Sequence, residues 1–159
     1  MHPAARTDNC AQLRRATTQD IRAIVPMMSD FHADDRLPWR PAQAMRALRE
    51  LIENDTCGVV WLIEVQNRPV GFLVLTLGFS LEFHGRYAFI DEFFIRPEFR
   101  GEGTGTAVLE CVIQYCANNG IPTVHLEVER SSPRVHSLYE RHGFQDRGFY
   151  LMSRWIDVK

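Results

Sequence analysis

Two adjacent carboxylates lie inside an apolar run that is typical of a buried strand. Asp91 and Glu92 belong to the segment AFIDEFFI, residues 88–95, whose other members are small, aromatic or β-branched. Neighbouring side chains of a strand point to opposite faces, so at least one carboxylate should face the interior or a cleft. Burial raises the pKa of a carboxyl group, which suits a general base near neutral pH. The alternative is structural, with one carboxylate paired to a core arginine and the other in solvent.

A glycine-rich turn and a helical pattern follow this strand directly. Pro97 ends the strand, and a turn with alternating glycines follows it, made of Gly101, Glu102, Gly103, Thr104 and Gly105. Apolar residues then recur at helical spacing, at Leu109, Val112, Ile113 and Cys116. A helix that starts at a glycine turn has free N–H groups and a positive dipole end, which together favour an anion such as phosphate.

Two well-known phosphate motifs do not fit this turn. A Rossmann fingerprint needs a third glycine at position 106, which is Thr106, and a P-loop needs a lysine that the turn lacks. A tight turn that needs glycine only for its backbone is the purely structural alternative.

The run Arg100-Gly101-Glu102-Gly103-Thr104-Gly105 resembles the Arg/Gln-x-x-Gly-x-Gly/Ala signature of the GCN5-related N-acetyltransferases, the GNAT superfamily. The preceding residues Phe94 to Phe99 are similar to that family's strand-to-loop run. The resemblance implies that backbone N–H groups from Gly101 to Thr106 hold the pyrophosphate of acetyl-CoA, with Arg100 adding positive charge. It also implies that the pantetheine arm bonds the strand backbone over Phe93, Phe94 and Ile95, and that no metal is required.

The segment Ser137-Leu138-Tyr139-Glu140-Arg141-His142-Gly143-Phe144 resembles the family's Leu-Tyr-x-x-x-Gly-Phe run. Helical spacing alone favours a core tyrosine, but the resemblance implies that Tyr139 lies at the thioester sulfur and protonates the leaving thiolate. Ser132 departs from the family, where asparagine often contacts the pantetheine arm, and its hydroxyl has a shorter reach.

The strand around Asp91 and Glu92 resembles the acidic strand of family members that acetylate small amines such as polyamines. Either carboxylate, directly or through water, is expected to take the amine's proton. Phe83 and His84 fall in a segment that would border the acceptor and are expected to contact it. The other histidines considered, at positions 125, 136 and 142, lack metal-ligand spacing and are interpreted as surface or packing residues.

Composition excludes several classes of protein. The 159 residues carry a net charge of −2, which gives no support for a nucleic-acid or anionic-membrane partner. No apolar run approaches the roughly 20 residues that span a bilayer, and the start lacks the apolar core of a signal peptide. The four cysteines are scattered without a CxxC pair, so a reducing cytoplasm is the expected compartment.

The order of elements predicts one α+β domain over residues 12–159 behind a flexible tail, residues 1–11. We expect a strand at 12–16, two helices, a hairpin of strands at 58–65 and 70–77, and a loop at 78–86. These are followed by the central strand and by the glycine turn with its helix. The last predicted elements are a strand at 123–128, a short helix after Ser132 and a strand at 149–155. Pro26 is expected to kink or shorten the first helix, and residues 30–40 to be irregular. The resemblance implies a mixed, mostly antiparallel sheet with splayed central strands.

The predicted activity is transfer of an acetyl group from acetyl-CoA to a primary amine. Acidic residues near the expected acceptor site favour a small cationic molecule, namely Asp30, Asp34, Asp35 and Glu82. A protein or peptide amine, a non-catalytic acyl-CoA-binding regulatory module and a nucleotide-binding domain are the alternatives. Family members are often dimers, so the resemblance also implies a homodimer.

Overall fold

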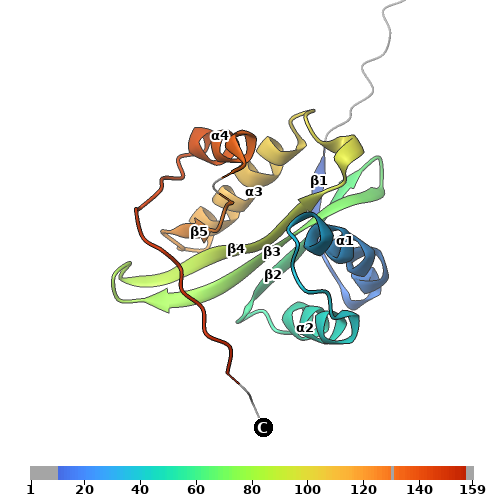
Figure 1. The fold of residues 1–159 in the computed structure, drawn as a ribbon, viewed down its shortest axis with the longest axis horizontal. Coiled ribbons are helices and arrows are strands. Elements are labelled where there is room, and N and C mark those ends of the chain that lie inside the picture. The colour runs from blue at the N-terminus through green and yellow to red at the C-terminus, as the bar shows by residue number, and fades with distance from the viewer. Residues whose placement is uncertain (1–10, 130, 157–159) are drawn as a thin grey trace, which may run out of the picture. The chain divides into compact units, whose positions relative to one another are not determined.

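The computed structural model describes residues 11–129 and 131–156. The chain divides into two compact units, Met1–Glu127 and Val128–Lys159. The first unit is built on a five-stranded sheet with the strand order β1-β2-β3-β4-β5 (Figure 1). In the described part of the chain, no helix is long and apolar enough to cross a membrane.

The elements of the first unit follow the predicted order. They are β1 (Gln12–Arg15), the 3-10 turn η1 (Thr18–Asp20), α1 (Ile21–Asp34), α2 (Pro41–Glu53), β2 (Gly58–Val65), β3 (Arg68–Ser80), β4 (Gly85–Ile95), η2 (Pro97–Phe99), α3 (Thr104–Asn118) and β5 (Val124–Leu126). The second unit contains α4 (Pro133–Arg141). Strands β1 to β4 are antiparallel neighbours, whereas β5 runs parallel to β4. The predicted α+β fold with a mixed, mostly antiparallel sheet is thereby confirmed.

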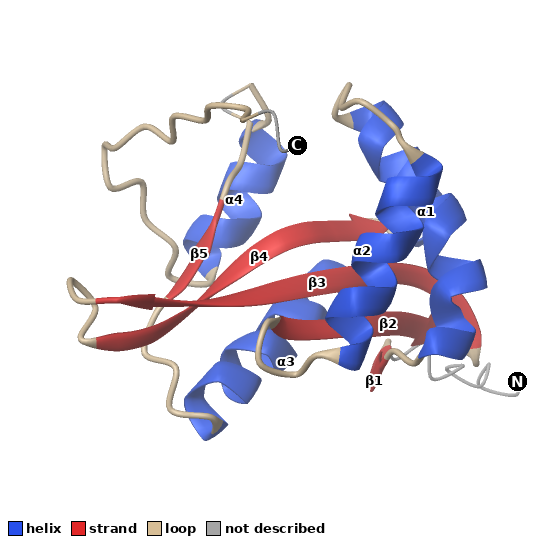
Figure 2. Ribbon diagram, turned by 90° about the horizontal axis from the view of Figure 1, so that it is seen from below, coloured by secondary structure: helices blue, strands red, loops and turns tan. Residues whose placement is uncertain are grey.

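Helices cover both faces of the sheet in the first unit (Figure 2). On one face, Phe72, Val74 and Phe94 form a core cluster with α1 and α2 residues that include Ile24, Met27 and Leu48. On the other face, Trp61 of β2 packs edge-on against Tyr115 of α3, with ring centroids 4.9 Å apart. Leu73 pairs with Trp61, so alternate residues of β3 serve the two faces.

The prediction that residues 30–40 are irregular was wrong for residues 30–34. α1 continues through Pro26 to Asp34, so residues 30–34 are helical rather than irregular. Proline removes the N–H that would bond the carbonyl of Arg22, but both residues lie on the exposed side of α1. Water can satisfy that carbonyl, while Met27 and Met28 hold the opposite side in the core.

Three predicted boundaries also change. The expected loop at 78–86 is mainly a hairpin, because β3 extends to Ser80 and β4 begins at Gly85. The strand predicted at 123–128 keeps only Val124–Leu126. The strand predicted at 149–155 is wrong, because these residues form no regular element. Strand propensity does not specify a partner strand, and a strand needs one. The predicted tail falls, except for Ala11, outside the described residues, and the single domain stays a prediction.

Candidate active site

A β-bulge in β4 decides which face of the sheet Glu92 occupies. Leu75 pairs with Ile90 and the next residue back, Val74, pairs with Glu92, so Asp91 is an extra residue between them. Paired residues share a face of the sheet. The bulge therefore moves Glu92 away from the α3 face, which Ile90 occupies, to the face that Val74 shares with α1 and α2. The strict alternation assumed from the sequence for the two carboxylates fails here.

His32 of α1 contacts Glu92 on that face. Its Nε2 atom lies 3.0 Å from Oε1 of Glu92, and its Nδ1 atom lies 3.2 Å from the carbonyl oxygen of Pro38. The imidazole also packs edge-on against Trp39, with ring centroids 5.2 Å apart. The side chains of His32 and Glu92 are only 18% and 14% exposed. These three contacts of the ring with its surroundings thus fix its place beside the carboxylate.

The local backbone explains how His32 reaches this place. His32 follows the buried Met28 by one helical turn, so its side chain leaves the same face of α1. After the helix ends, Arg36 adopts a φ of 55°. The N–H of Leu37 then donates to the carbonyl of His32 over 2.8 Å. This tight turn brings Pro38 back beside the His32 ring.

Burial dominates the electrostatics of the two carboxylates. It raises the pKa of Glu92 above its usual range, and the hydrogen bond and charge of His32 lower that pKa in part. The charges of Asp91 and Asp35 raise it further. Asp91 is exposed to solvent, unlike Glu92, but partial desolvation by the surrounding protein still raises its pKa against the opposing charge of His32. Within the described residues, Oε2 of Glu92 is buried without a hydrogen-bond partner, so this oxygen can accept a proton from a bound group.

The glycine turn has the geometry of an anion site. Gly101 and Gly103 have φ values of 88° and 87°, a left-handed conformation in which a side chain would be strained. α3 starts directly after Gly103, and its first intrahelical donor is the N–H of Ala107, which bonds the Gly103 carbonyl at 3.0 Å. The preceding N–H groups, those of Thr104, Gly105 and Thr106, therefore point out of the helix start, where the dipole is positive.

Arg100 is held at the start of this turn by three contacts. Its Nε donates to the carbonyl of Ile95 over 2.6 Å, and its Nη2 lies 3.2 Å from Oδ2 of Asp34. Its guanidinium lies over the Phe94 ring, 5.3 Å from the centroid. The arginine thus connects the end of α1 to the end of β4 and keeps a positive charge beside the glycine turn.

The edge of β4 that faces away from β3 is open beyond the bulge. β5 pairs with β4 only from Ala88 to Ile90, and no other strand in the described ranges pairs with that edge. The N–H of Arg96 bonds Val70 of β3, so by alternation the backbone groups of Phe93 and Ile95 face the open edge. An extended ligand can bond there, although the carbonyl of Ile95 is already taken by Arg100.

Residues 25–144 match the acetyltransferase (GNAT) family. The chain belongs to the GNAT family and is an N-acetyltransferase. This match covers most of α1, the elements from α2 to α4, the glycine turn and the segment around Tyr139, and it confirms the resemblance given by the two sequence motifs.

Known relatives extend along nearly the whole of this GNAT chain. An integron cassette protein from the mobile metagenome of Cole Harbour Salt Marsh is 34% identical, with a TM-score of 0.82 over 93% of this chain and 92% of that one. The uncharacterized N-acetyltransferase YhfO of Bacillus subtilis is 28% identical over 86% of this chain and 92% of its own length. The thialysine N-epsilon-acetyltransferase of Bos taurus is 28% identical over 84% of both chains.

The residues expected to border the acceptor in this GNAT chain lie at the far end of the β3–β4 hairpin. Phe83 packs against His125, with ring centroids 4.7 Å apart, and against Tyr87, at 6.3 Å. The Tyr87 ring lies over Gly78, where a Cβ atom would come within 2.4 Å of it. His84 closes the turn with a φ of 57°. Phe83 thus belongs to a packed aromatic group, and its contact with substrate stays a prediction.

The remaining predicted site residues of the GNAT chain belong to the second unit. Ser132 occupies the N-cap position of α4, but its hydroxyl makes no capping hydrogen bond. Tyr139 is partly buried on α4, and its ring packs edge-on against Phe144, with centroids 5.6 Å apart. Their roles toward acetyl-CoA stay predictions.

His32 is the residue that sequence reasoning missed. The buried positions Ile21, Ile24 and Met28 form a helical stripe, and one further turn along it reaches His32. Because residues 30–40 were expected to be irregular, this stripe was not extended beyond Met28. The signal was present in the spacing, but its partner, Glu92, lies 60 residues away in sequence.

Proposed function

We propose that the chain transfers the acetyl group of acetyl-CoA to the primary amine of a small cationic molecule, with Glu92 as the general base. One observation carries this proposal: a buried carboxylate on the central strand has a raised pKa and one oxygen without a partner among the described residues. Asp91, the preceding residue, whose pKa is also raised, is the second candidate for the base.

Acetyl-CoA is the donor that this family's chemistry requires, and two parts of the first unit support it. The outward N–H groups at the start of α3 suit the pyrophosphate, with the charge of Arg100 nearby. The open edge of β4 suits the amide groups of the pantetheine arm, at the backbone of Phe93 and at the N–H of Ile95.

The proposed reaction proceeds by direct attack of the amine on the thioester. Glu92 takes a proton from the ammonium group, so one N–H bond breaks and one O–H bond forms. The freed nitrogen lone pair forms the C–N bond, and collapse of the tetrahedral intermediate breaks the C–S bond. Tyr139 is the proposed acid that gives the departing thiolate its proton, which leaves coenzyme A as a thiol. The nitrogen loses a second proton as the amide forms, which restores Tyr139, and Glu92 releases the first proton to solvent.

Charge around Glu92 favours an amine that arrives as a cation. Asp91 and Asp35 both act on Glu92 electrostatically, so the site holds an excess of acidic groups. Asp34 forms an ion pair with Arg100, so we no longer count it among the acidic residues that favour a cationic acceptor. The bovine relative is a thialysine N-epsilon-acetyltransferase, and a small amine of that type fits an acidic site. Lysine-like amines and polyamines are thus the first acceptors to test.

Two linked measurements test the proposal. A thermal-shift titration should show a saturable rise in melting temperature with acetyl-CoA and none with ATP or NAD. Thiol release is then followed with thialysine, lysine, spermidine, an aminoglycoside and a short peptide as acceptors. Release with a small amine supports the proposal, and release with the peptide alone would assign a protein acceptor. Binding of acetyl-CoA without release from any acceptor would instead indicate a regulatory module.

A further inference from the structure

The contacts of the His32 ring fix where its protons are. A backbone carbonyl only accepts hydrogen bonds, so Nδ1, which lies 3.2 Å from the Pro38 oxygen, must carry a hydrogen. Nε2 is therefore the nitrogen that varies, and it lies 3.0 Å from Oε1 of Glu92. A neutral ring with its hydrogen on Nδ1 would point the Nε2 lone pair at a carboxylate oxygen, which is repulsive.

A single proton between Nε2 and Oε1 removes this repulsion. The pair then exists as imidazolium with carboxylate or as imidazole with carboxylic acid, and Oε1 is occupied in both forms. The other oxygen, Oε2, is buried and has no hydrogen-bond partner in the described part of the chain. The two oxygens of Glu92 are thus unequal, and of the two only Oε2 has its hydrogen-bonding capacity unused among the described residues.

We propose that His32 is a positioning residue for Glu92, which it holds by Oε1 so that Oε2 is presented to the acceptor amine. This inference rests on the proposed function, since it takes Glu92 as the base. The Pro38 carbonyl and the Trp39 ring hold the imidazole, so the carboxylate has one preferred orientation before substrate arrives.

The proposed arrangement also stays intact through proton transfer. With His32 as imidazolium and Glu92 as carboxylate, Oε2 takes one proton from the ammonium group of the acceptor. An N–H bond of the amine breaks, an O–H bond forms at Oε2, and the nitrogen keeps its lone pair for attack on the thioester. Oε1 then becomes the carbonyl oxygen of a neutral acid, which still accepts from the Nε2–H of His32. No contact of the pair has to break during the step.

His32 further supports ionisation of a base that burial disfavours. The charged groups that act on Glu92 are His32 from α1, Asp91 from β4 and Asp35 at the end of α1. Burial and the two aspartates raise the pKa of Glu92, and His32 alone among these groups lowers it. Removal of His32 should therefore raise this pKa further and shift the acidic limb of kcat/KM to higher pH.

The first test is independent of catalysis. Long-range 1H–15N correlation spectra of the 15N-labelled, ligand-free protein report which ring nitrogen carries the hydrogen, and His32→Gln assigns the signal. We expect Nδ1 of His32 to remain protonated throughout a titration from pH 5 to pH 9. A neutral ring with its hydrogen on Nε2 would overturn the inference, whatever the enzyme does with amines.

The second test is the pH profile of kcat/KM for a set of variants. His32→Phe should lower kcat/KM at pH 7 by up to about 100-fold and shift the acidic limb upward, with acetyl-CoA affinity retained. His32→Gln keeps a donor for Oε1 without the charge and should restore part of the rate. His136→Gln is the matched control, since the His136 ring bonds a backbone carbonyl, that of Glu129, on the second unit.

The outcomes separate the two proposals. If Glu92→Gln is inactive but His32→Phe keeps the wild-type rate and pH profile, the positioning role is wrong and the proposed function stands. If Glu92→Gln keeps full activity, or if no small amine is acetylated, the proposed function fails at its base or its acceptor. Should His32→Phe not fold, His32→Gln and the spectra still decide the question.

Discussion

Asp20 and Glu92 have equally exposed side chains, 14% each, yet their surroundings shift their pKa values in opposite directions. Hydrogen bonds from Arg14 are the main cause that lowers the pKa of Asp20, to about 2. Burial raises the pKa of Glu92, and a single partner, His32, opposes the rise only in part. Equal exposure therefore does not predict protonation; the number of donors to each oxygen does.

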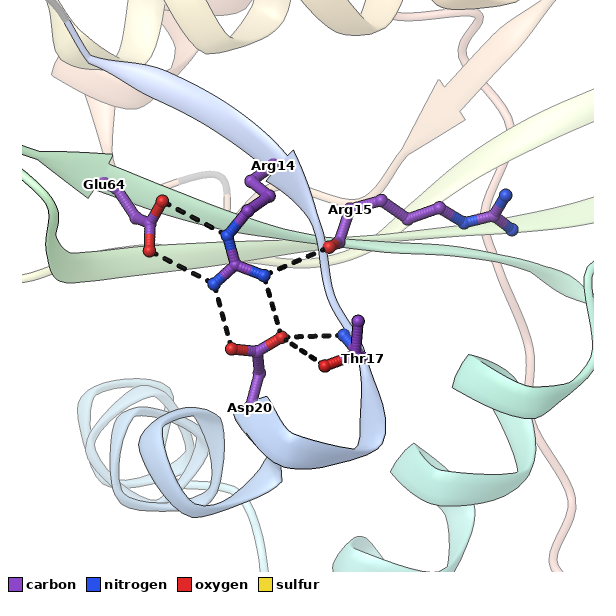
Figure 3. A network of polar contacts seen from close by, with 5 residues as sticks. All are labelled: Arg14, Arg15, Thr17, Asp20 and Glu64. Atoms are coloured by element: carbon purple, nitrogen blue, oxygen red, sulfur yellow. Dashed lines mark hydrogen bonds and ion pairs between the residues drawn. The ribbon is translucent and has the colours of Figure 1, made fainter.

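The surroundings of Asp20 form a complete network, which we call the Arg14 cluster: Arg14, Thr17, Asp20 and Glu64 (Figure 3). Arg14 bonds both oxygens of Asp20, at 2.9 and 3.0 Å, and both oxygens of Glu64, at 3.1 and 3.3 Å. The N–H and hydroxyl of Thr17 add bonds to Asp20 at 2.7 and 3.0 Å. The network joins β1 and β2 to the start of α1.

The Arg14 cluster and the surroundings of Glu92 illustrate two uses of a carboxylate. In the Arg14 cluster every carboxylate oxygen has a donor, so the charged form is stabilised and the elements are held together. At Glu92 one oxygen lacks a partner among the described residues, so the charged form costs free energy that a bound cation can recover. The Arg14 cluster is thus suited to stabilising the fold, and the surroundings of Glu92 are suited to accepting a proton.

The largest effect expected from this contrast is on catalysis. Glu92→Gln keeps the shape but removes the base, so kcat/KM with a small amine should fall by about 10²- to 10⁴-fold. The rate of thiol release at a subsaturating amine concentration measures this fall in kcat/KM. Glu64→Gln, in the Arg14 cluster, is the matched control and should keep a rate close to wild type. Equal losses in the two variants would show that both act through stability and would remove the contrast.

The next largest effect is on the stability that the Arg14 cluster contributes. Asp20→Asn should lower the free energy of unfolding at pH 7 by about 1 kcal/mol, a value reduced for solvent screening of the pair. Because the folded pKa of about 2 lies below the ordinary value of 3.8, this contribution is complete above pH 4 and is lost as the pH falls toward 2. Urea unfolding of both proteins from pH 2 to pH 7 measures the difference. A difference in unfolding free energy that grows as the pH falls would contradict the lowered pKa of Asp20.

The sequence predicted the glycine turn better than the surroundings of Glu92. Gly101 and Gly103 need a left-handed backbone, and such a requirement is visible in residue type alone. The helix after the turn and the hairpin of strands at 58–65 and 70–77 were also predicted, because their apolar periodicity is local. The family resemblance rested on these same local features.

The surroundings of Glu92 depend on contacts that residue types do not encode locally. The bulge at Asp91 changes the face that Glu92 occupies, and it is visible only in the pairing of β4 with β3. His32 was missed because residues 30–40 were expected to be irregular, whereas the helix continues past Pro26, which is tolerated at its exposed position. Arg14, which no sequence motif marked, joins residues up to 50 positions apart.

A smaller effect on stability should have the opposite sign from that of Asp20→Asn. The folded state of Glu92 binds its proton more tightly than the unfolded state, so the stability that this proton provides is present below the unfolded pKa and is lost as the pH rises through the folded pKa. Glu92→Gln should therefore raise the melting temperature at pH 8 and leave it unchanged near pH 4. Differential scanning calorimetry at the two pH values tests this, with Asp20→Asn scanned alongside. A variant less stable than wild type at pH 8 would mean that His32 outweighs burial.

The smallest predicted effect is a difference in salt dependence between the stability contributions of the Arg14 cluster and of Glu92. In 1 M NaCl the Debye length falls to about 3 Å, so ion pairs that solvent reaches are weakened while buried ones are screened much less. The Arg14 side chain is 44% exposed, so the stability gap between wild type and Asp20→Asn should shrink by a few tenths of a kcal/mol. The gap between wild type and Glu92→Gln should change less, because the partner of Glu92, His32, is only 18% exposed. Urea unfolding at pH 8 in 0.05 M and 1 M NaCl compares both gaps, and equal salt sensitivity would show that solvent reaches the His32–Glu92 pair as freely as the Arg14–Asp20 pair.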